Sequence, residues 1–308
     1  MCLRQGRVPR STAMSPSILQ IVVLGIVQGA TELLPVSSSA HVIAAERLMR
    51  LDPSSPEMTF LLIMLHAGTM TAMIAYFWES WKRSFFASAA QLRGALVRVG
   101  LATTATLCIG VPLILAVERF VLGGRPGADV ELLFSNLPLV AASLAAAGAL
   151  ILVAGLRSRA PEEPPRPSAS AGSSVPIGPA IWIGAVQGLI GPFRGLSRSG
   201  LTISTGMLLG VPRRVSEEFS FALAVVITPP LIVRELLRFY RDRAAGPGTV
   251  DVAALVMPGL LGMAFSFGAG LLALRWLSGW LERGHWHYFG IYCFAAAAGI
   301  CALARMGY

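Results

Sequence analysis

The chain has 308 residues, of which 55% are hydrophobic and only 13% are charged, and its mean hydropathy is +0.67. In soluble domains about a quarter of all residues are charged, so this composition excludes an ordinary soluble domain. The net charge of +9 comes from basic residues that stand singly or in pairs in loops, a pattern that favours contact with anionic lipid headgroups over nucleic acid.

The first 16 residues, MCLRQGRVPRSTAMSP, form a basic extension. No short apolar core with a small-residue cleavage site follows them, so the sequence does not indicate a removable signal peptide. Met14 is an alternative start. We expect residues 17–308 to form a single membrane domain.

The segment 17–49 starts as an apolar helix, runs into the polar cluster PVSSSAH and then becomes helical again. This interruption is typical of a re-entrant hairpin, because backbone that leaves the helix at membrane depth needs protein or a wet cavity to satisfy its polar groups. Gln28 and Glu32 are four residues apart and therefore share one helical face.

Ionisable residues at membrane depth are the most informative in this chain, since each costs at least about 2.5 kcal/mol near the bilayer centre. Glu32 therefore needs a partner or a function. Ser37, Ser38 and Ser39 follow it, and then His41. The alternative interpretation is structural, with a serine capping a helix and the histidine packed against a carbonyl.

Three apolar runs that are long enough to cross about 30 Å of hydrocarbon come next, at 58–78, 94–117 and 132–156. They lack the alternating polarity of barrel strands. After them, residues 157–175 are rich in Pro, Ser and charge and predict an exposed linker.

The segment 176–212 resembles the first interrupted segment. Gln187 pairs with Gln28, and Ser197 pairs with Ser38 at the same offset without gaps. Because three spans separate the two segments, the second would enter the membrane from the opposite face. The sequence thus predicts two inverted repeats, 17–156 and 176–308.

The second hairpin carries a set of donors around Arg198. A guanidinium group in a water-poor pocket suits a phosphate, because it gives paired, charge-assisted hydrogen bonds. The hydroxyls of Ser197, Ser199 and Thr202 and the first amides of the following helix would add donors to the same anion. The alternative is an ordinary interfacial arginine.

Three further spans are expected at 219–237, 252–275 and 287–304. The predicted fold is therefore an all-α polytopic membrane protein, an inverted repeat with two re-entrant helical hairpins plus about six full transmembrane helices. Broken helices of such repeats meet near the bilayer midplane, where Glu32 and Arg198 would face a shared site.

Two stretches resemble the ordered motifs of the undecaprenyl-diphosphate phosphatase (bacitracin-resistance) family: VQGATELLPVSSSAH at 27–41 and RGLSRSGLT at 194–202. LHAGT and GMLLGVPRR also match the family, so the resemblance extends over most of the chain from residue 17. There are two departures. Gln28 stands at an acidic position, and Arg194-Gly195 replaces the Pro-Gly that usually opens the second motif.

The resemblance implies hydrolysis of undecaprenyl (polyprenyl) diphosphate to the monophosphate and inorganic phosphate in a bacterial plasma (inner) membrane. This reaction recycles the lipid carrier for peptidoglycan and cell-wall synthesis and confers bacitracin resistance. A divalent cation, Mg²⁺ or Ca²⁺, is the implied cofactor. The expected partners are the polyprenyl diphosphate and membrane lipids, with no nucleic acid, and a homodimer is compatible with the sequence.

The implied roles divide into three groups. The catalytic residues would be Glu32, His41, Ser38, Ser197 and Arg198. Phosphate would be bound by Arg198, Ser37, Ser199, Thr202 and Gln28, and the metal by Glu32. The sequence does not choose between Ser38 and Ser197 as nucleophile, nor between His41 and Glu32 as proton acceptor.

Two other functions compete. A polyprenyl-phosphate carrier or flippase could have the same inverted repeat, because fold alone does not distinguish it from an enzyme. A flippase needs an anion site but neither nucleophile nor base, so the convergence of these side chains favours hydrolysis. Acid-phosphatase-like lipid phosphatases place a histidine soon after a Ser-Arg motif, whereas here none follows Arg198 until His285.

Overall fold

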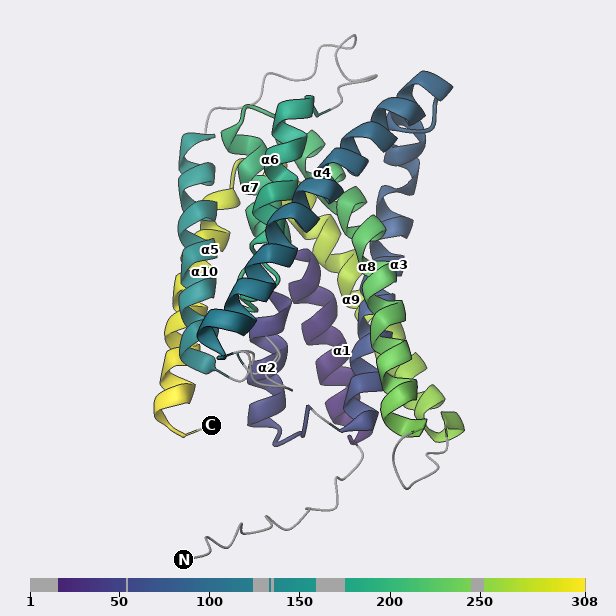
Figure 1. Ribbon diagram of the computed structural model, residues 1–308, viewed down its shortest axis with the longest axis vertical. Coiled ribbons are helices and arrows are strands. Elements are labelled where there is room, and N and C mark those ends of the chain that lie inside the picture. The colour runs from purple at the N-terminus through teal and green to yellow at the C-terminus, as the bar shows by residue number, and fades with distance from the viewer. Residues whose placement is uncertain are drawn as a thin grey trace, which may run out of the picture.

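The computed structural model describes residues 16–53, 55–123, 133, 136–158, 175–244 and 252–307, and this part of the chain is helical and contains no strand (Figure 1). The basic extension 1–16 and the linker 157–175 fall almost entirely outside the described residues. The elements are α1 Ile18–Leu33, α2 Ser38–Leu48, α3 Pro56–Ser84, α4 Ala89–Ala116, the π-helix η1 Val117–Val121, α5 Leu137–Arg157, α6 Ile177–Gly188, α7 Arg198–Leu208, α8 Arg213–Ala244, α9 Val252–Glu282 and α10 Trp286–Arg305.

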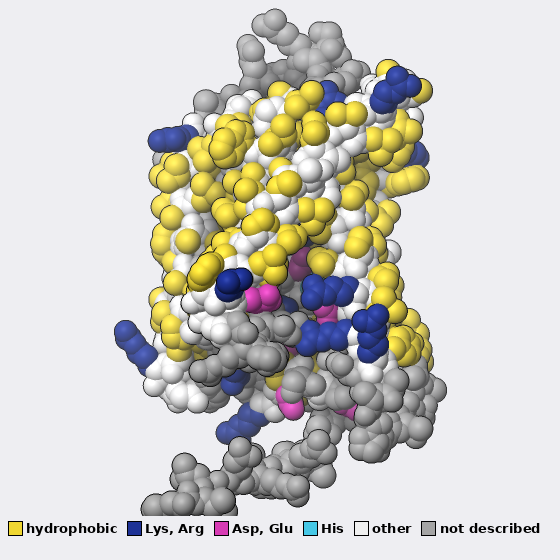
Figure 2. All heavy atoms as spheres, in the orientation of Figure 1, with side chains coloured by type: hydrophobic (Ala, Val, Ile, Leu, Met, Phe, Trp, Pro, Cys, Tyr) yellow, Lys and Arg dark blue, Asp and Glu magenta, His cyan; other side chains and the backbone are white. Residues whose placement is uncertain are grey.

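Within the described residues, six helices are long and apolar enough to cross a membrane, which confirms the six predicted spans. They are Glu57–Ser84, Ala89–Val121, Leu137–Arg157, Arg213–Arg241, Leu255–Glu282 and Trp286–Arg305. Hydrophobic side chains cover most of the face seen in Figure 2, with basic side chains near its two ends and a mixed group of basic and acidic side chains in its lower half. The chain is a multi-pass membrane protein.

Three helix starts lie five or more residues from the predicted ones. α4 begins at Ala89 instead of 94, because the side chain of Ser88 caps it by accepting from the amide of Gln91 at 3.2 Å. α5 begins at Leu137 instead of 132, because the side chain of Asn136 caps it by accepting from the amide of Leu139 at 3.0 Å. α8 begins at Arg213 instead of 219. The charged residues in its first turns are not typical of a membrane span. Glu217 and Glu218 are nevertheless buried in the helix, because they accept hydrogen bonds from hydroxyl groups of neighbouring helices.

The two interrupted segments form helix pairs, α1–α2 and α6–α7, as predicted. α1 has 16 residues and is about 24 Å long, and α6 has 12, so neither crosses about 30 Å of hydrocarbon alone. In Figure 1 the α1–α2 pair occupies the lower half and the α6–α7 pair the upper half. The pairs therefore come from opposite ends of the molecule, which is consistent with inverted re-entrant hairpins. Their depth in a bilayer stays a prediction.

Small residues let each hairpin approach a long helix of the other repeat. Gly25 and Gly29 of α1 pack against α9, while Gly184 and Gly188 of α6 pack against α4. The offset that pairs Gln28 with Gln187 also pairs these glycines. Each repeat therefore uses the same small-xxx-small device, which membrane helices use for close backbone contact.

The two repeats meet along several helix pairs. α5 packs along α10, and α3 contacts both α8 and α9. The largest apolar cluster lies at these contacts and includes Phe77, Trp81, Leu144, Leu277 and Trp286. This cluster holds the surrounding helices in place around the two hairpin turns, where the polar residues gather.

A glycine pair on α6 tests this packing. A β-carbon at Gly184 would lie 2.1 Å from the carbonyl oxygen of Ala102, whereas one at Gly178 would meet nothing within 4 Å. We expect Gly184→Ala to lower the stability by roughly 1–3 kcal/mol or more, because helices α6 and α4 must separate. Gly178→Ala, the matched control on the same helix, should leave the thermal unfolding temperature in detergent nearly unchanged. Equal effects of the two substitutions would contradict the proposed contact.

Candidate active site

An ion pair joins the two hairpins at the centre of the site. Nη2 of Arg198, the first residue of α7, donates to Oε1 of Glu32 near the end of α1 at 3.2 Å. The two side chains are only 18% and 17% exposed, so neither charge is well solvated. The structure thus brings together the acid and the base that the sequence placed 166 residues apart.

The other oxygen of the Glu32 carboxylate receives two donors from its own hairpin. Ser38 Oγ donates to Oε2 at 2.5 Å, and Gln28 Nε2 donates to the same atom at 3.2 Å. The contact between Gln28 and Glu32 follows from their spacing of four on α1. Glu32 therefore accepts from a guanidinium, a hydroxyl and an amide at once, and Ser38 is the hydroxyl in direct contact with a carboxylate.

Arg198 has an unused donor beside this pair. Its Nη1 is buried and has no hydrogen-bond partner among the residues that the structure describes. Ser197 precedes it as the N-cap of α7, and its hydroxyl accepts from the amide of Gly200 at 3.2 Å. A free buried guanidinium donor next to a helix N-terminus is suited to an anion. Ser197 Oγ contacts no carboxylate or histidine in the described chain.

Two hydrogen bonds tie the turns of the hairpins together. Ser37 Oγ donates to the carbonyl oxygen of Arg194 at 3.2 Å, and Ser199 Oγ donates to that of Leu34 at 3.2 Å. Both serines thus have backbone partners at the junction. Gly195 lets the second turn lie close against α5, since a β-carbon there would lie 2.0 Å from the carbonyl oxygen of Val140.

Ser37 has a strained backbone, with φ of 65° in the left-handed region that non-glycine residues rarely adopt. Three contacts hold it there. Its hydroxyl accepts from the Ala40 amide and donates to Arg194, and its carbonyl accepts from His41. Such strain commonly occurs at functional sites. Here the left-handed conformation of Ser37 directs the side chain of the following residue, Ser38, toward Glu32.

His41 points toward the second repeat and makes no described contact with Glu32. Nδ1 lies 2.8 Å from the carbonyl oxygen of Ser37, which can only accept, so Nδ1 carries the proton. In the neutral ring Nε2 then accepts from the hydroxyl of Tyr292 on α10, at 2.7 Å. The two rings are also nearly parallel, with centroids 5.7 Å apart. The carbonyl of Ser37 thus fixes the tautomer of His41, and the contact with Tyr292 fixes the orientation of its ring.

Thr202 lies behind Arg198 on α7 and is fully buried. Its hydroxyl donates to the carbonyl of Arg198 at 2.8 Å and lies 2.5 Å from Ser220 Oγ of α8. It therefore connects the first turn of α7 to α8.

Sequence reasoning missed two neighbours of the site, Tyr292 and Ser220. A tyrosine in an apolar run and a serine in FSF carry no recognisable signal. His66 of α3 contacts the carbonyl oxygen of Leu62 through Nδ1 at 2.8 Å.

The metal-binding capacity of the site is limited. In the described ranges, no group of three or more His, Cys, Asp or Glu side chains could hold a metal ion. Glu32 is the one carboxylate in contact with Arg198 and Ser38. Magnesium binds through one or two carboxylates together with substrate phosphates and water. These residues therefore fit a divalent cation only if a bound diphosphate supplies most of its ligands.

Comparison with known proteins assigns the family. The model of the bacitracin resistance protein BacA family matches residues 21–299. The chain belongs to the BacA family. One BacA-type relative, undecaprenyl-diphosphatase 2 of Acinetobacter baylyi, is 48% identical over 93% of this chain and 98% of its own length.

More distant relatives have similar coverage. The undecaprenyl-diphosphatase of Desulfosudis oleivorans is 33% identical over 90% of this chain and 94% of its own length. Undecaprenyl-diphosphatase 1 of A. baylyi is 29% identical over 94% of this chain and 97% of its own length. The BacA resemblance seen in the two motifs is thus confirmed over nearly the whole chain.

The ion pair can be tested through stability. Removing one partner of a buried pair leaves the other charge unpaired and is strongly destabilising, whereas removing both is less so. We expect Glu32→Gln and Arg198→Met each to lower the unfolding temperature, and the double variant to lower it by less than the sum, with a coupling of about 1–3 kcal/mol. Thermal unfolding of the four proteins in one detergent measures this. Additive effects would show that the two side chains do not interact.

Proposed function

We propose that this chain is an undecaprenyl-diphosphate phosphatase, which hydrolyses a polyprenyl diphosphate to the monophosphate and inorganic phosphate within the membrane. The observation that carries the proposal is the Ser38–Glu32–Arg198 arrangement. It combines a hydroxyl in contact with a carboxylate and a guanidinium with one donor unused. The names of the relatives support the same reaction.

Arg198 would bind the terminal phosphate of the substrate. Its buried Nη1 can donate to a phosphate oxygen before the ion pair with Glu32 is disturbed. Phosphoryl transfer depends mainly on positioning and on stabilising charge that develops on phosphate oxygens. A guanidinium in a poorly solvated site meets both needs.

Ser38 is the proposed nucleophile. Its Oγ attacks the terminal phosphorus and its proton passes to Glu32 Oε2, to which it already donates at 2.5 Å. The bond between that phosphorus and the bridging oxygen breaks, and the lipid monophosphate leaves. Water then attacks the phosphorus of the phosphoserine, the bond between phosphorus and Ser38 Oγ breaks, and the proton held by Glu32 returns to Ser38 as inorganic phosphate leaves. Hydroxyl nucleophiles need such an adjacent base.

His41 has an orienting role in this scheme, through its contacts with Ser37 and Tyr292 at either end of the ring. It holds the first turn of α2, on which Ser38 stands. Ser37, Ser199 and Thr202 would act similarly through the backbone of the two turns, and Gln28 by holding Glu32.

A divalent cation is part of the proposal. Mg²⁺ or Ca²⁺ bound to the diphosphate would add charge stabilisation, and Glu32 could supply it with one ligand. The bacterial inner membrane as location, the polyprenyl chain of the substrate and a homodimer stay predictions, supported by the membership of the BacA family for the first two.

Phosphate release from undecaprenyl diphosphate by the purified protein tests the function directly. We expect turnover by the wild type, stimulated by Mg²⁺ or Ca²⁺ and reduced by a chelator. We also expect Arg198→Ala and Glu32→Ala to lose it. No release under any ion condition from folded protein would refute the phosphatase and favour the carrier, whose transport of lipid phosphate across vesicles would be measured next.

Alanine variants distinguish the two serines. Ser38→Ala should reduce the rate by at least about 10³-fold, because no other hydroxyl contacts Glu32 in the described chain. Ser197→Ala should lose a helix cap, about 1 kcal/mol of stability, and retain part of its turnover. Ser39→Ala is the matched control on α2. Full turnover by Ser38→Ala would exclude that serine as nucleophile.

Tyr292→Phe tests the orientation of His41. It removes one hydroxyl and keeps the ring, so we expect kcat to fall roughly tenfold with little change in KM, as for one lost hydrogen bond. In the His41→Gln background the same change should have no further effect on kcat. A similar loss in both backgrounds would show that Tyr292 acts independently of His41.

A further inference from the structure

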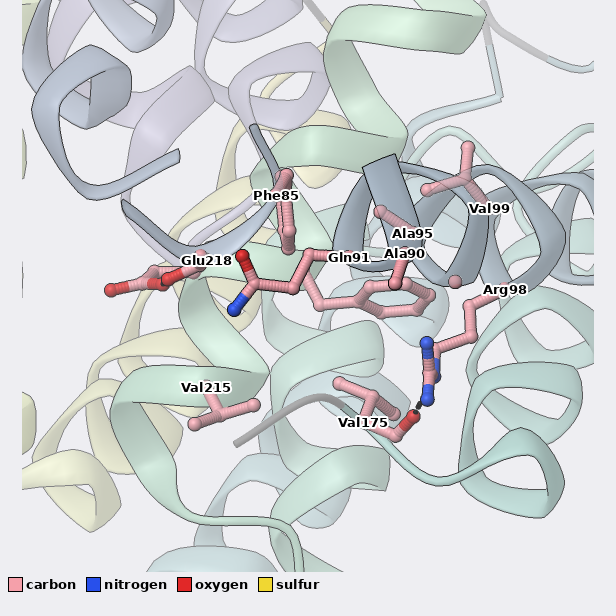
Figure 3. A pocket seen from close by; sticks show the side chains of 12 residues that line it. Phe85, Ala90, Gln91, Ala95, Arg98, Val99, Val175, Val215 and Glu218 are labelled. Atoms are coloured by element: carbon pink, nitrogen blue, oxygen red, sulfur yellow. Dashed lines mark hydrogen bonds between the residues drawn. The ribbon is translucent and has the colours of Figure 1, made fainter. Parts of the chain in front are cut away.

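A cavity of about 280 Å³ lies away from the hairpin turns, between the first turns of α4 and α8 (Figure 3). Its walls are mainly apolar and come from four elements. The lining side chains used below are Gln91 and Arg98 of α4, Glu218 and Phe219 of α8, and Val175 just before α6. None of the proposed catalytic residues lines it.

Arg98 provides donors on one side of this cavity. Its Nε donates to the carbonyl oxygen of Val175 at 2.7 Å, which anchors the guanidinium beside the wall. The two terminal amino groups make no hydrogen bond with any residue that the structure describes. A planar, fixed guanidinium with two free amino groups is suited to a phosphate.

Acceptors stand on the other side. In Figure 3 the amide of Gln91 and the carboxylate of Glu218 lie across the cavity from the guanidinium of Arg98. Gln91 Oε1 is buried and has no hydrogen-bond partner within the described chain. Glu218 accepts from Ser80, Ser84 and Arg214. Two carboxylate oxygens offer about four acceptor positions, so one remains open.

The cavity lies between α4 and α8, and the corresponding position between α9 and α3 is filled by close helix packing. The offset that pairs Gln28 with Gln187 also pairs Phe60 with Phe219. Phe60 packs directly against Gly259 where α3 meets α9, while Phe219 lines the cavity where α8 faces α4. α3 and α9 pack closely along their length, whereas α8 and α4 make far fewer contacts. The space is thus specific to the contact between α4 and α8 and is absent from the corresponding contact between α9 and α3.

We propose that this cavity binds the headgroup of a zwitterionic aminophospholipid, with its phosphate at Arg98 and its primary ammonium at Gln91 and Glu218. The opposite poles of the cavity match the opposite charges of such a headgroup. The acceptors need a hydrogen-bond donor, which a quaternary choline lacks, and Glu218 favours a donor that carries a positive charge. The hydroxyl groups of an anionic glycerol headgroup could donate to Gln91, but such a headgroup has no positive charge to place beside Glu218.

The position in the membrane agrees with this ligand. The span Ala89–Val121 has 33 residues and is about 50 Å long, more than the roughly 30 Å of hydrocarbon. Its first turns therefore reach the headgroup region. The cavity is near the lower end of the size typical of small-molecule pockets, enough for a headgroup. The exposed Leu96, Val97 and Leu101 of α4 would contact the acyl chains outside.

Native mass spectrometry of the full chain with three lipids of identical acyl chains tests the proposal: phosphatidylethanolamine, phosphatidylcholine and phosphatidylglycerol. We expect phosphatidylethanolamine to bind roughly tenfold more tightly than the other two, as one charge-assisted hydrogen bond allows. Equal binding of all three, no binding, or a preference for phosphatidylglycerol would each overturn it.

Two variants test whether the preference for phosphatidylethanolamine depends on residues that line the cavity. Gln91→Leu should reduce phosphatidylethanolamine binding to the level of phosphatidylcholine, and Ala95→Leu should reduce it by filling the space. Leu96→Trp on the outer face of α4 and Arg93→Gln, an exposed arginine outside the lining, are the controls and should bind as the wild type does. An unchanged preference in Gln91→Leu would contradict the assigned ammonium site.

Phosphate release by the same variants separates this proposal from the proposed function. Gln91 and Ala95 lie outside the Glu32–Arg198 site, so lipid-free detergent samples of both variants should release phosphate at the wild-type rate. The headgroup preference of the wild type also remains measurable if the chain proves to have no phosphatase activity.

Discussion

A charge inside a membrane protein must be paired, and the pairing of Glu32 with Arg198 organises the centre of this molecule. Each hairpin contributes one partner, so neither repeat can satisfy its own ionisable residue. The two turns must meet for the charges to meet, and the hydrogen bonds of Ser37 and Ser199 to opposite backbones lie at this junction. Small residues such as Gly195 then become necessary, because the turns approach neighbouring backbone closely.

The repeats share a plan but not a detailed packing. In both, a glycine-containing first helix crosses onto a long helix of the other repeat. Only the first repeat closes its third helix tightly against α9, while the gap beside α8 remains as a cavity. Both repeats therefore contribute to the site at the hairpin junction and to the cavity, but the cavity has no counterpart where α3 meets α9. Approximate symmetry allows two different kinds of lipid contact in one fold.

Much of this could be predicted from the sequence, because membrane proteins give strong local signals. Length and hydropathy predicted six spans, and the polar interruptions predicted two hairpins. Glu32 and Arg198 were recognisable as partners because both are expensive at membrane depth. The early start of α8 was missed, since buried glutamates in a helix look like a loop until the serines that satisfy them, on other helices, are known.

The direction in which a side chain points could not be predicted either. His41 was expected beside the reacting groups, yet its ring reaches Tyr292, a residue 251 positions away with no motif around it. Ser38 and Ser197 were equivalent in sequence, and they differ in the structure because one precedes a helix whose amide it caps while the other contacts Glu32. Such distinctions depend on backbone geometry, here on the unusual φ of Ser37.

The resting arrangement of the central pair also bears on how a substrate could enter. A guanidinium fully occupied by Glu32 would have to break its ion pair before it met a phosphate, which is costly where water is scarce. Arg198 keeps Nη1 free, so the first phosphate contact adds a partner without removing one. As the phosphate takes over Nη2, the Glu32 carboxylate loses its cation and becomes a stronger proton acceptor for the hydroxyl of Ser38. Binding of the anion would thus activate the base that the proposed reaction needs, and water or another neutral ligand would not.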